Sequence, residues 1–561
     1  MDNLRLVLWA GFFVLLWLGV NQWNSDYGAP NPPSAASTQK NAAPAQTNNN
    51  TKEASGVLGL SDNLPVIAIE NGPTETSENP RLSTRLVTVT TDVFELSINP
   101  DRGGDIVQAR LLKYFPNKDD QSKKIELLSY NEDNYQYFQT GLLSLSGLPE
   151  PNHQQAFLET DRKIELREGQ EQVSTSLVWK IKQDQTNLEV KKSYTFQRGR
   201  YDILLTYDIK NLGTQDYTFV LYNQLVKKDK KAERSMFNVE TYSYNGPIIY
   251  NGESYQKIDT AELADSPLRE THTNGWASNI QHHFLVAMVP EQNQPYTFSA
   301  SSDPANELYK VAMVGQTPVT VRPGARAQVS TTFFVGPKIQ EQLKDVAQGL
   351  ELSVDFGKLT FLSAPLFWLL NKTHQLVRNW GLAIILVTLL IKLLFYPLTE
   401  ASGKSMAKMR KVQPRIKAIQ DRHKDDKQAQ SQAMMELYKK EKVNPMAGCL
   451  PMLIQIPFFI AFYWVLLESV EIRQAPFFLW IQDLSSRDPY FVLPLLMGLG
   501  MFFQQKLNPA PPDPMQAKIM TAMPIMFTAM FAFFPSGLVL YWLTNSLLSI
   551  AQQWKINRAA Q

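Results

Sequence analysis

Hydrophobic residues gather at the two ends of this chain. One apolar run covers Leu6–Val20, and further runs lie between Trp380 and Ile550. Between these ends, apolar and polar residues often alternate, which is typical of half-buried β-strands. The pattern predicts a multidomain protein, with an N-terminal anchor helix, a large antiparallel β-sandwich domain and a polytopic α-helical membrane bundle that has a core of five helices.

The N-terminal apolar run fits either a membrane anchor or the core of a cleavable signal peptide. No small-x-small cleavage site follows it, since the next residues are Asn21, Gln22 and Trp23. This favours an uncleaved transmembrane signal anchor over residues 1–23. Residues 24–59 are rich in Pro, Ala, Asn, Thr, Gln and Ser. This composition predicts a disordered linker.

Residues 60–337 carry the strand pattern without a regular helical repeat. Turn residues such as Asn99–Gly104 separate the alternating stretches. We therefore expect one antiparallel β-sandwich domain, which lies outside the cytoplasm because the anchor precedes it. Its clearest predicted strands are Leu86–Ile98, Val173–Lys182, Leu188–Phe196, Tyr201–Asn211, Phe284–Val289 and Gln328–Val335.

The pattern changes to a helical period after residue 337. Over residues 338–379 the pattern predicts amphipathic helices. The stretch Leu359–Val377 is typical of a helix that lies on the membrane surface. Over residues 380–553 the pattern then predicts five membrane-spanning helices, most of them shorter than the ~20 residues that a bilayer core requires. The predicted spans are Trp380–Tyr396, Ala447–Leu467, Phe491–Phe503, Ile519–Phe534 and Leu538–Ile550, followed by a tail at 554–561.

Charge in the loops predicts the orientation of these spans. The segment Thr399–Val443 holds twelve Lys and Arg against six Asp and Glu, whereas Glu468–Tyr490 holds two against four. The positive-inside rule places the first segment in the cytoplasm and the second outside. With the anchor counted, both termini are cytoplasmic and residues 60–337 are outside.

The basic segment 399–444 predicts a helical hairpin that projects into the cytoplasm. Apolar positions lie on both sides of the polar stretch Asp421–Gln432. Its cations either remain solvated and only fix the topology, or they meet RNA or anionic headgroups. The candidate contact residues are Lys404, Lys408, Arg410, Lys411, Arg415 and Lys417.

Lys392 is the most informative single residue, because it lies in an otherwise apolar span. An intramembrane cation is a functional candidate by default, although its long side chain could also snorkel to the nearby cytoplasmic interface. Thr388 lies four residues earlier on the same helical face and favours a polar stripe. Other spans carry polar groups that either pair between helices or line a water-filled cavity with this cation: Gln455, Tyr541, Trp542 and Asn545.

Composition and motifs exclude several other classes of protein. The net charge of +2 provides no global basic field for nucleic acids, and the single cysteine, Cys449, excludes an intrachain disulfide. His282 and His283 would point to opposite faces of a strand and make a poor ligand pair. The segment Gly403-Lys404-Ser405 lacks the earlier glycine of a phosphate-binding loop, and Ser536 has no histidine in the surrounding spans. We expect no catalytic residue, metal or cofactor.

Several blocks together resemble the YidC membrane protein insertases of Gram-negative bacteria, in the YidC/Oxa/Alb family, over the whole chain. The blocks are Tyr396-Pro397-Leu398-Thr399, Ser405-Met406-Ala407-Lys408-Met409-Arg410, Glu441-Lys442-Val443-Asn444-Pro445, Gln455-Ile456-Pro457, Arg473-Gln474-Ala475-Pro476-Phe477 and Phe534-Pro535-Ser536-Gly537-Leu538-Val539-Leu540-Tyr541.

The resemblance implies an inner-membrane insertase and chaperone with a hydrophilic groove that opens to the cytoplasm and to lipid. The family's groove cation, usually Arg, falls on Lys392, which keeps the charge but loses the planar fork. The groove positions fall on Thr388, Gln455 and Tyr541 or Trp542. The implied partners are nascent membrane proteins, the Sec translocon with its accessory subunits, the ribosome, the signal-recognition pathway and the phospholipid bilayer.

Two other functions remain compatible with the residues alone. A solute transporter or channel could use the same polar cavity, although the five spans show no internal repeat. A structural envelope protein could act through the β-domain, with the spans as its anchor. Deletion of residues 60–337 would abolish the function of such a protein, whereas an insertase should tolerate it.

Overall fold

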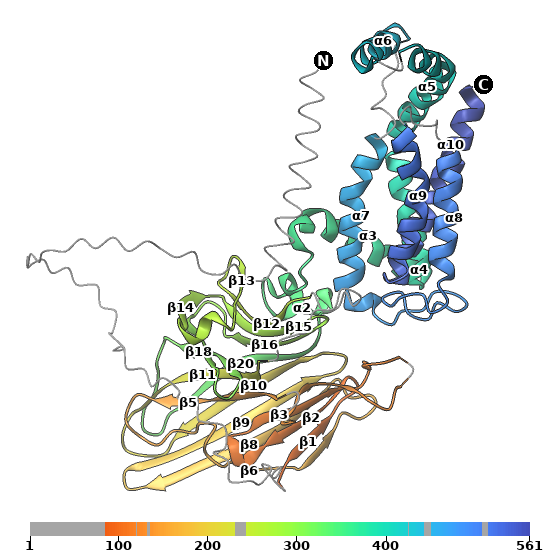
Figure 1. The fold of residues 1–561 in the computed structure, drawn as a ribbon. Coiled ribbons are helices and arrows are strands. Elements are labelled where there is room, and N and C mark those ends of the chain that lie inside the picture. Colours follow the sequence, from red (N-terminus) through yellow and green to blue (C-terminus); the bar gives the residue numbers. More distant parts are fainter. Residues whose placement is uncertain are drawn as a thin grey trace, which may run out of the picture. The chain divides into compact units, whose positions relative to one another are not determined.

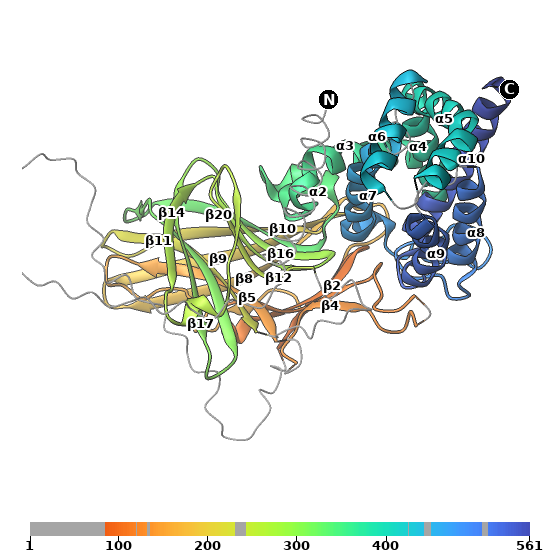
Figure 2. The ribbon, with the colours of Figure 1, turned by 45° about the horizontal axis from the view of Figure 1, so that its top comes forward.

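The computed structural model describes residues 85–118, 120–131, 135–229, 243–423, 426–441, 450–507 and 514–560. The predicted anchor at 1–23, the linker at 24–59 and the start of the segment 60–337 lie outside the described residues. The described chain contains a β-rich part followed by a helical part (Figures 1 and 2).

The β-rich part consists of two large sheets, which confirms the predicted β-sandwich. The eleven-stranded sheet has the order β14-β17-β18-β11-β5-β3-β2-β1-β7, with β19 paired to β11 and β4 paired to β3. Its strands are β1 (Val87–Thr90), β2 (Phe94–Asn99), β3 (Asp105–Leu111), β4 (Ile125–Leu128), β5 (Gln136–Ser144), β7 (Lys163–Glu165), β11 (Tyr217–Lys228), β14 (Leu268–Thr273), β17 (Pro295–Asp303), β18 (Leu308–Gly315) and β19 (Val319–Val321).

The nine-stranded sheet has the order β13-β12-β15-β16-β20-β10-β9-β8-β6. Long strands at its centre follow the predicted positions closely. Its strands are β6 (Leu158–Glu159), β8 (Gln172–Gln183), β9 (Thr186–Gln197), β10 (Asp202–Asn211), β12 (Asn245–Tyr250), β13 (Tyr255–Lys257), β15 (Trp276–Gln281), β16 (Phe284–Pro290) and β20 (Arg326–Pro337).

The core of the sandwich lies between the two sheets. Alternate residues of β9 and β10 are buried, as the period of two predicts. The rings of Phe138 on β5 and Phe333 on β20 stack across the sheets with their centroids 3.7 Å apart. Burial of such aromatic surface is the main stabilising contribution in this part of the chain.

Three details of the β-rich part differ from the sequence prediction. The stretch Leu86–Ile98 is two strands, because the Thr91 hydroxyl accepts hydrogen bonds from the backbone of Val93 and Phe94 and forms a turn. Strands β1 and β7 pair in parallel, whereas we expected only antiparallel pairs. His282 and His283 lie in the turn between β15 and β16, and their rings stack at 3.7 Å rather than pointing apart.

His153 is a buried histidine, and protonation of its ring opposes folding. Its Nδ1 atom lies 2.5 Å from the hydroxyl oxygen of buried Tyr222. Burial lowers the pKa of His153 to about 4, and the cations Arg102, Lys192 and Lys310 lower it in the same direction. The ring is therefore neutral at pH 7.

Acidification is expected to destabilise the protein through His153. Between pH 6.5 and pH 4 the unfolded histidine binds a proton that the folded one does not, so the free energy of unfolding falls as the pH falls. The loss from this group is on the order of 3 kcal/mol. Unfolding of the full chain in detergent at both pH values measures it, with His153→Gln as the comparison. An equal loss in His153→Gln would contradict this role for His153.

Within the described residues, the helical part begins with short helices and continues with eight longer ones, α3 to α10. The 3₁₀ helices in the described part of the chain are η1 (Pro100–Arg102), η4 (Glu262–Ala264), η5 (Leu350–Ser353), η6 (Gly357–Leu359) and η8 (Val470–Ile472). The α-helices are α2 (Gln340–Val346), α3 (Thr360–Val377), α4 (Trp380–Leu394), α5 (Tyr396–Arg422), α6 (Lys427–Lys440), α7 (Leu450–Glu468), α8 (Val492–Lys506), α9 (Pro514–Phe531) and α10 (Ser536–Ala560).

Specific side chains set the ends of these helices. Asn379 caps α4 by accepting a hydrogen bond from the Leu382 N–H, and Asp426 caps α6 in the same way. Helix α5 continues through Pro414 to Arg422, and it packs on α6 through Val412, Ile416 and Tyr438. Helix α10 continues to Ala560, well past the predicted end of the last span at Ile550, because Gln, Lys and Arg are good helix formers.

None of the described helices is, by itself, both long and apolar enough to cross a membrane. Helices α4 and α5 meet this criterion only as a pair, with a bend of 65° between them, and Leu453–Glu468 and Lys518–Phe531 form shorter apolar helices. The five predicted spans therefore remain a prediction. Helix α10 packs against α4, α5 and α8, while α9 packs against α8 and α3 packs against α4 and α7.

Candidate functional site

A cavity of about 440 Å³ lies among the helices of the helical part. Six helices contribute to its wall: α4, α5, α7, α8, α9 and α10. The lining residues are Lys392, Thr399, Ser402, Gly403, Met406, Gln455, Ile456, Phe459, Met501, Gln504, Gln505, Met520, Met523, Pro524, Phe527, Met530, Phe531, Tyr541, Trp542, Asn545, Ser546, Ser549, Gln553 and Ile556. The cavity is therefore partly polar and partly apolar.

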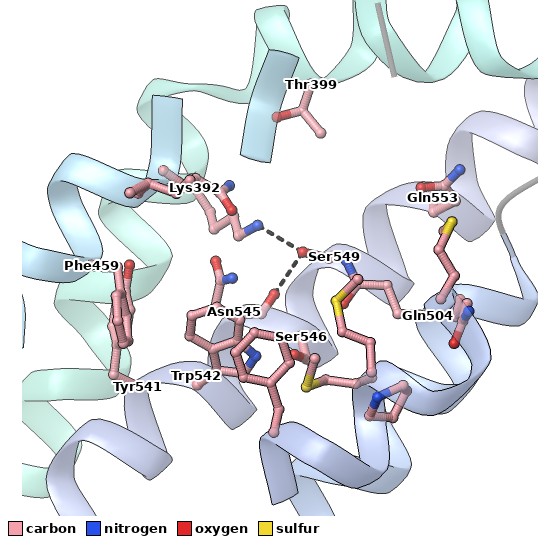
Figure 3. Close-up of a pocket in the computed structure, with 18 of the residues that line it drawn as sticks. Lys392, Thr399, Phe459, Gln504, Tyr541, Trp542, Asn545, Ser546, Ser549 and Gln553 are labelled. Atoms are coloured by element: carbon pink, nitrogen blue, oxygen red, sulfur yellow. Dashed lines mark hydrogen bonds between the residues drawn. The ribbon is translucent and has the colours of Figure 1, made fainter. Parts of the chain in front are cut away.

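Lys392 on α4 is the one charged residue among the lining residues that the structure describes. Figure 3 shows its side chain pointing to Ser549. The Lys392 side chain is 4% exposed, and its Nζ donates a hydrogen bond of 2.7 Å to the Ser549 hydroxyl. That hydroxyl in turn donates to the carbonyl oxygen of Asn545, also at 2.7 Å. Because Ser549 uses its proton on its own helix, its oxygen lone pairs face the amine and hold it towards α10.

A polar row on α10 continues from this contact. Asn545, Ser549 and Gln553 are spaced four residues apart, so they lie on one face of the helix and all line the cavity. Gln504 and Gln505 on α8 add two more amides. These neutral groups can donate and accept hydrogen bonds, so the cavity can satisfy a polar chain segment that leaves water.

Aromatic rings make another part of the wall. The rings of Phe459 on α7 and Trp542 on α10 meet edge to face at 4.8 Å. Tyr541 stacks on Phe462, with centroids 4.6 Å apart, and is almost fully buried. Phe531 on α9 lies 5.5 Å from Trp542. These contacts link α7, α9 and α10 beside the polar row.

The structure brings together five of the six residues that the sequence placed at this site. Lys392, Gln455, Tyr541, Trp542 and Asn545 all line the cavity. Thr388 does not line it; its hydroxyl donates to the Ile384 carbonyl of its own helix at 2.6 Å, and the residue is buried. A threonine that bonds to its own helix needs no partner from the cavity.

Sequence reasoning missed several polar lining residues. Gln504, Gln505 and Gln553 lie beyond the predicted ends of their spans, because their polarity marks a span boundary when only hydropathy is considered. The four-residue spacing of Asn545, Ser549 and Gln553 was a usable signal. It predicts one polar face if the helix continues past Ile550, which it does.

The six basic residues assigned to the hairpin all lie along α5 and do not line the cavity. Lys404 forms an ion pair with Glu400 at 2.8 Å, and Arg415 forms one with Glu441 at 2.5 Å. Lys408, Lys411 and Lys417 are exposed, and Arg410 is half-buried. Within the described residues, no group of three His, Cys, Asp or Glu side chains is placed to hold a metal ion.

The charge of the lining determines what the cavity can do. The lining residues that the structure describes include no Asp or Glu, so none of them neutralises the charge of Lys392. An amine in such a setting attracts an acidic or strongly polar group of a ligand. The amine, amides and hydroxyls of the described lining are groups that can bind a polar ligand.

Sequence comparison now identifies the family. Residues 86–369 match the YidC periplasmic domain, and residues 372–561 match the family described as 60Kd inner membrane protein. The chain is 44% identical over 570 residues to the membrane protein insertase YidC of Thioalkalivibrio sulfidiphilus (strain HL-EbGR7), covering 100% of this chain and 98% of that relative. This chain belongs to the YidC membrane protein insertase family.

Other proteins are similar over all or most of the chain. The membrane protein insertase YidC of Stutzerimonas stutzeri (strain A1501) is 41% identical, with 100% of this chain and 98% of the relative covered. A crystal structure of an active YidC insertase with its first transmembrane domain resolved aligns over 84% of this chain and 92% of that one, with 19% identity and a TM-score of 0.38. From the family matches and the full-length relatives, the chain is a membrane protein insertase with a periplasmic domain.

Proposed function

We propose that the cavity is the intramembrane groove in which this insertase receives the polar flank of a client protein. In this proposal, Lys392 supplies the positive charge, and Gln455, Tyr541, Trp542 and Asn545 contribute to the wall. The polar flank enters the cavity, where hydrogen-bonding groups and the amine reduce its cost of desolvation. The apolar segment of the client then enters lipid along α7 and α9, and its burial drives release.

The observation that carries the proposal is the position of the Lys392 amine. It lies in a cavity, bonded to Ser549 on α10, and none of the lining residues that the structure describes is a carboxylate. A lysine that only snorkels to the membrane surface would direct its amine away from the neighbouring helices. A structural ion pair would place an acidic partner beside it.

Exposed apolar side chains support the placement of these helices in a bilayer. They occur on all five helices that would form the spans, and such a surface on a soluble protein would promote aggregation. The exposed residues outside the described cavity lining are Leu390, Leu393, Leu394, Leu453, Ile460, Leu495, Leu496, Leu499, Phe502, Phe503, Ile519, Ile525, Met526, Leu547 and Trp554. The helices are short, so this part of the proposal includes local thinning of the membrane.

The charge of the loops supports an orientation. The basic segment 399–444 lies in the cytoplasm, both termini are cytoplasmic, and residues 60–337 are periplasmic. The exposed cations of α5 are then available to the ribosome, the signal-recognition pathway or anionic lipid headgroups. The Sec translocon and its accessory subunits complete the proposed set of partners.

Cysteine accessibility tests the proposed groove. In a Cys449→Ser background the chain has no other cysteine, so Lys392→Cys and Asn545→Cys each introduce a single thiol. In membrane vesicles with the cytoplasmic face outward, we expect a membrane-impermeant thiol reagent to label both positions, because a polar cavity holds water.

Leu390→Cys is the matched control for this labelling. Leu390 is 47% exposed on the same helix, two residues from Lys392, and does not line the cavity. Under the proposal it faces lipid and remains unlabelled. If Lys392→Cys were as unreactive as Leu390→Cys, the proposed groove would be contradicted.

A further inference from the structure

Methionines form a distinct part of the cavity wall. The structure describes five of them in the lining, from three helices: Met406 on α5, Met501 on α8, and Met520, Met523 and Met530 on α9. In Figure 3, sulfur atoms lie in the cavity on the side away from Lys392 and Phe459. We call these five residues the methionine face.

The methionine face is less buried than Tyr541 and Phe531 in the aromatic part of the wall. None of its side chains is fully buried, and Met530 is 42% exposed. Tyr541 and Phe531, in contrast, are almost fully buried, and Tyr541 stacks on Phe462 behind the lining. Methionine has an unbranched side chain with a polarisable sulfur, so it can repack around apolar groups of different shapes at little cost.

The activity of an insertase creates a need for such a surface. Nascent membrane proteins present apolar segments of many sequences, which range from leucine-rich to β-branched and aromatic. A rigid wall of branched side chains would fit some of these segments and reject others, whereas flexible methionine-rich surfaces accept partners of varied shape.

We propose that the methionine face is the specificity-determining surface for the apolar segment of the client, and that it makes insertion tolerant of that segment's shape. The inference rests on the proposed function, since it assigns the polar wall around Lys392 to the client's flank and the methionine face to its apolar segment. It concerns a different part of the client, so the two can be tested separately.

A client panel with one constant acidic flank tests the inference. Three single-span clients would carry leucine-rich, valine- and isoleucine-rich, or phenylalanine-rich segments of equal length and hydropathy. With the full-length protein in liposomes, we expect insertion rates that agree within about threefold. In a second protein, all five methionines are replaced by leucine, which has a similar volume. This variant should insert the leucine-rich client at the wild-type rate, and its insertion rate for at least one other client should fall about fivefold or more.

Methionines outside the cavity provide the matched control. The variant with Met409, Met434, Met435, Met497 and Met526 replaced by leucine carries the same number of identical changes in the helical part, away from the lining. This control variant should preserve the wild-type ratios among the insertion rates of the three clients. If the cavity variant also kept these ratios, the inference would be overturned. An equal fall in the insertion rates of all three clients would overturn it as well. A Lys392 substitution should lower all three rates together, so failure of the groove proposal gives a different result.

Discussion

Replacing Lys392 by glutamate is expected to slow the insertion of a client with an acidic flank on the order of 100-fold. Two unit charges about 6 Å apart, at an effective dielectric constant of about 40, interact by about 1.4 kcal/mol. Removal of the cation in Lys392→Ala should therefore cost about tenfold, and reversal of its charge should double the change in free energy. Lys392→Arg retains the charge and should stay close to wild type. Rates are measured with purified protein in liposomes.

The client provides the decisive control for this experiment. A client whose flank carries lysines in place of acidic residues should reverse the order and favour Lys392→Glu, because only the sign of the interaction has changed. Lys506→Glu introduces the same change of charge on α8, outside the cavity lining, and should have little effect. Equal insertion of the acidic client by all three Lys392 variants would remove the electrostatic role.

Asp488→Ala is expected to destabilise the helical part by about 3–5 kcal/mol, a loss typical of a buried charged acceptor with several donors. The Asp488 carboxylate is buried in the loop before α8. It accepts hydrogen bonds from the Trp480 indole at 3.0 Å, the Tyr490 N–H at 3.0 Å and the Leu493 N–H at 2.6 Å. The last bond caps α8, whose N-cap residue Phe491 has no side-chain acceptor.

Thermal unfolding of the full chain in detergent measures this effect. The midpoint should fall by about 10 °C, and insertion should weaken because α8 carries Met501, Gln504 and Gln505 of the cavity lining. Arg487→Ala changes the exposed neighbouring residue and should stay within about 0.5 kcal/mol of wild type. Asp488→Asn keeps one acceptor oxygen, so its unfolding midpoint should lie between those of Asp488→Ala and Arg487→Ala. A midpoint for Asp488→Ala equal to that of Arg487→Ala would contradict the capping role.

Strands of the sandwich were predictable where one face is buried and the other is polar. Strands β8, β9 and β10 match their predicted ranges to within a few residues, because each alternation reports burial directly. The break between β1 and β2 was not predicted, since Thr91 interrupts the strand through a side-chain hydrogen bond without changing the hydropathy pattern. The parallel pairing of β1 with β7 depends on long-range contacts that no local pattern records.

Lys392 stood out at the candidate site because a cation inside an apolar helix is costly anywhere in a membrane. Thr388 was placed with it on the basis of spacing, but its hydroxyl bonds to Ile384 of the same helix, which removes any need for a partner across the cavity. Ser549 escaped notice because a serine near the end of an apolar run has many possible roles. Only the approach of α10 to α4 gives it one.

The sequence by itself determined the order of the parts, the β-sandwich, the family and the residue that carries the charge, because hydropathy, local turn chemistry and motif blocks are encoded by neighbouring residues. Tertiary structure alone decided which polar groups meet Lys392, that its cavity has no carboxylate among the described lining residues, and that methionines from α5, α8 and α9 share the wall. These facts depend on the packing of helices that are distant in the chain, and a side chain's partner across such a packing is not encoded by its own periodicity.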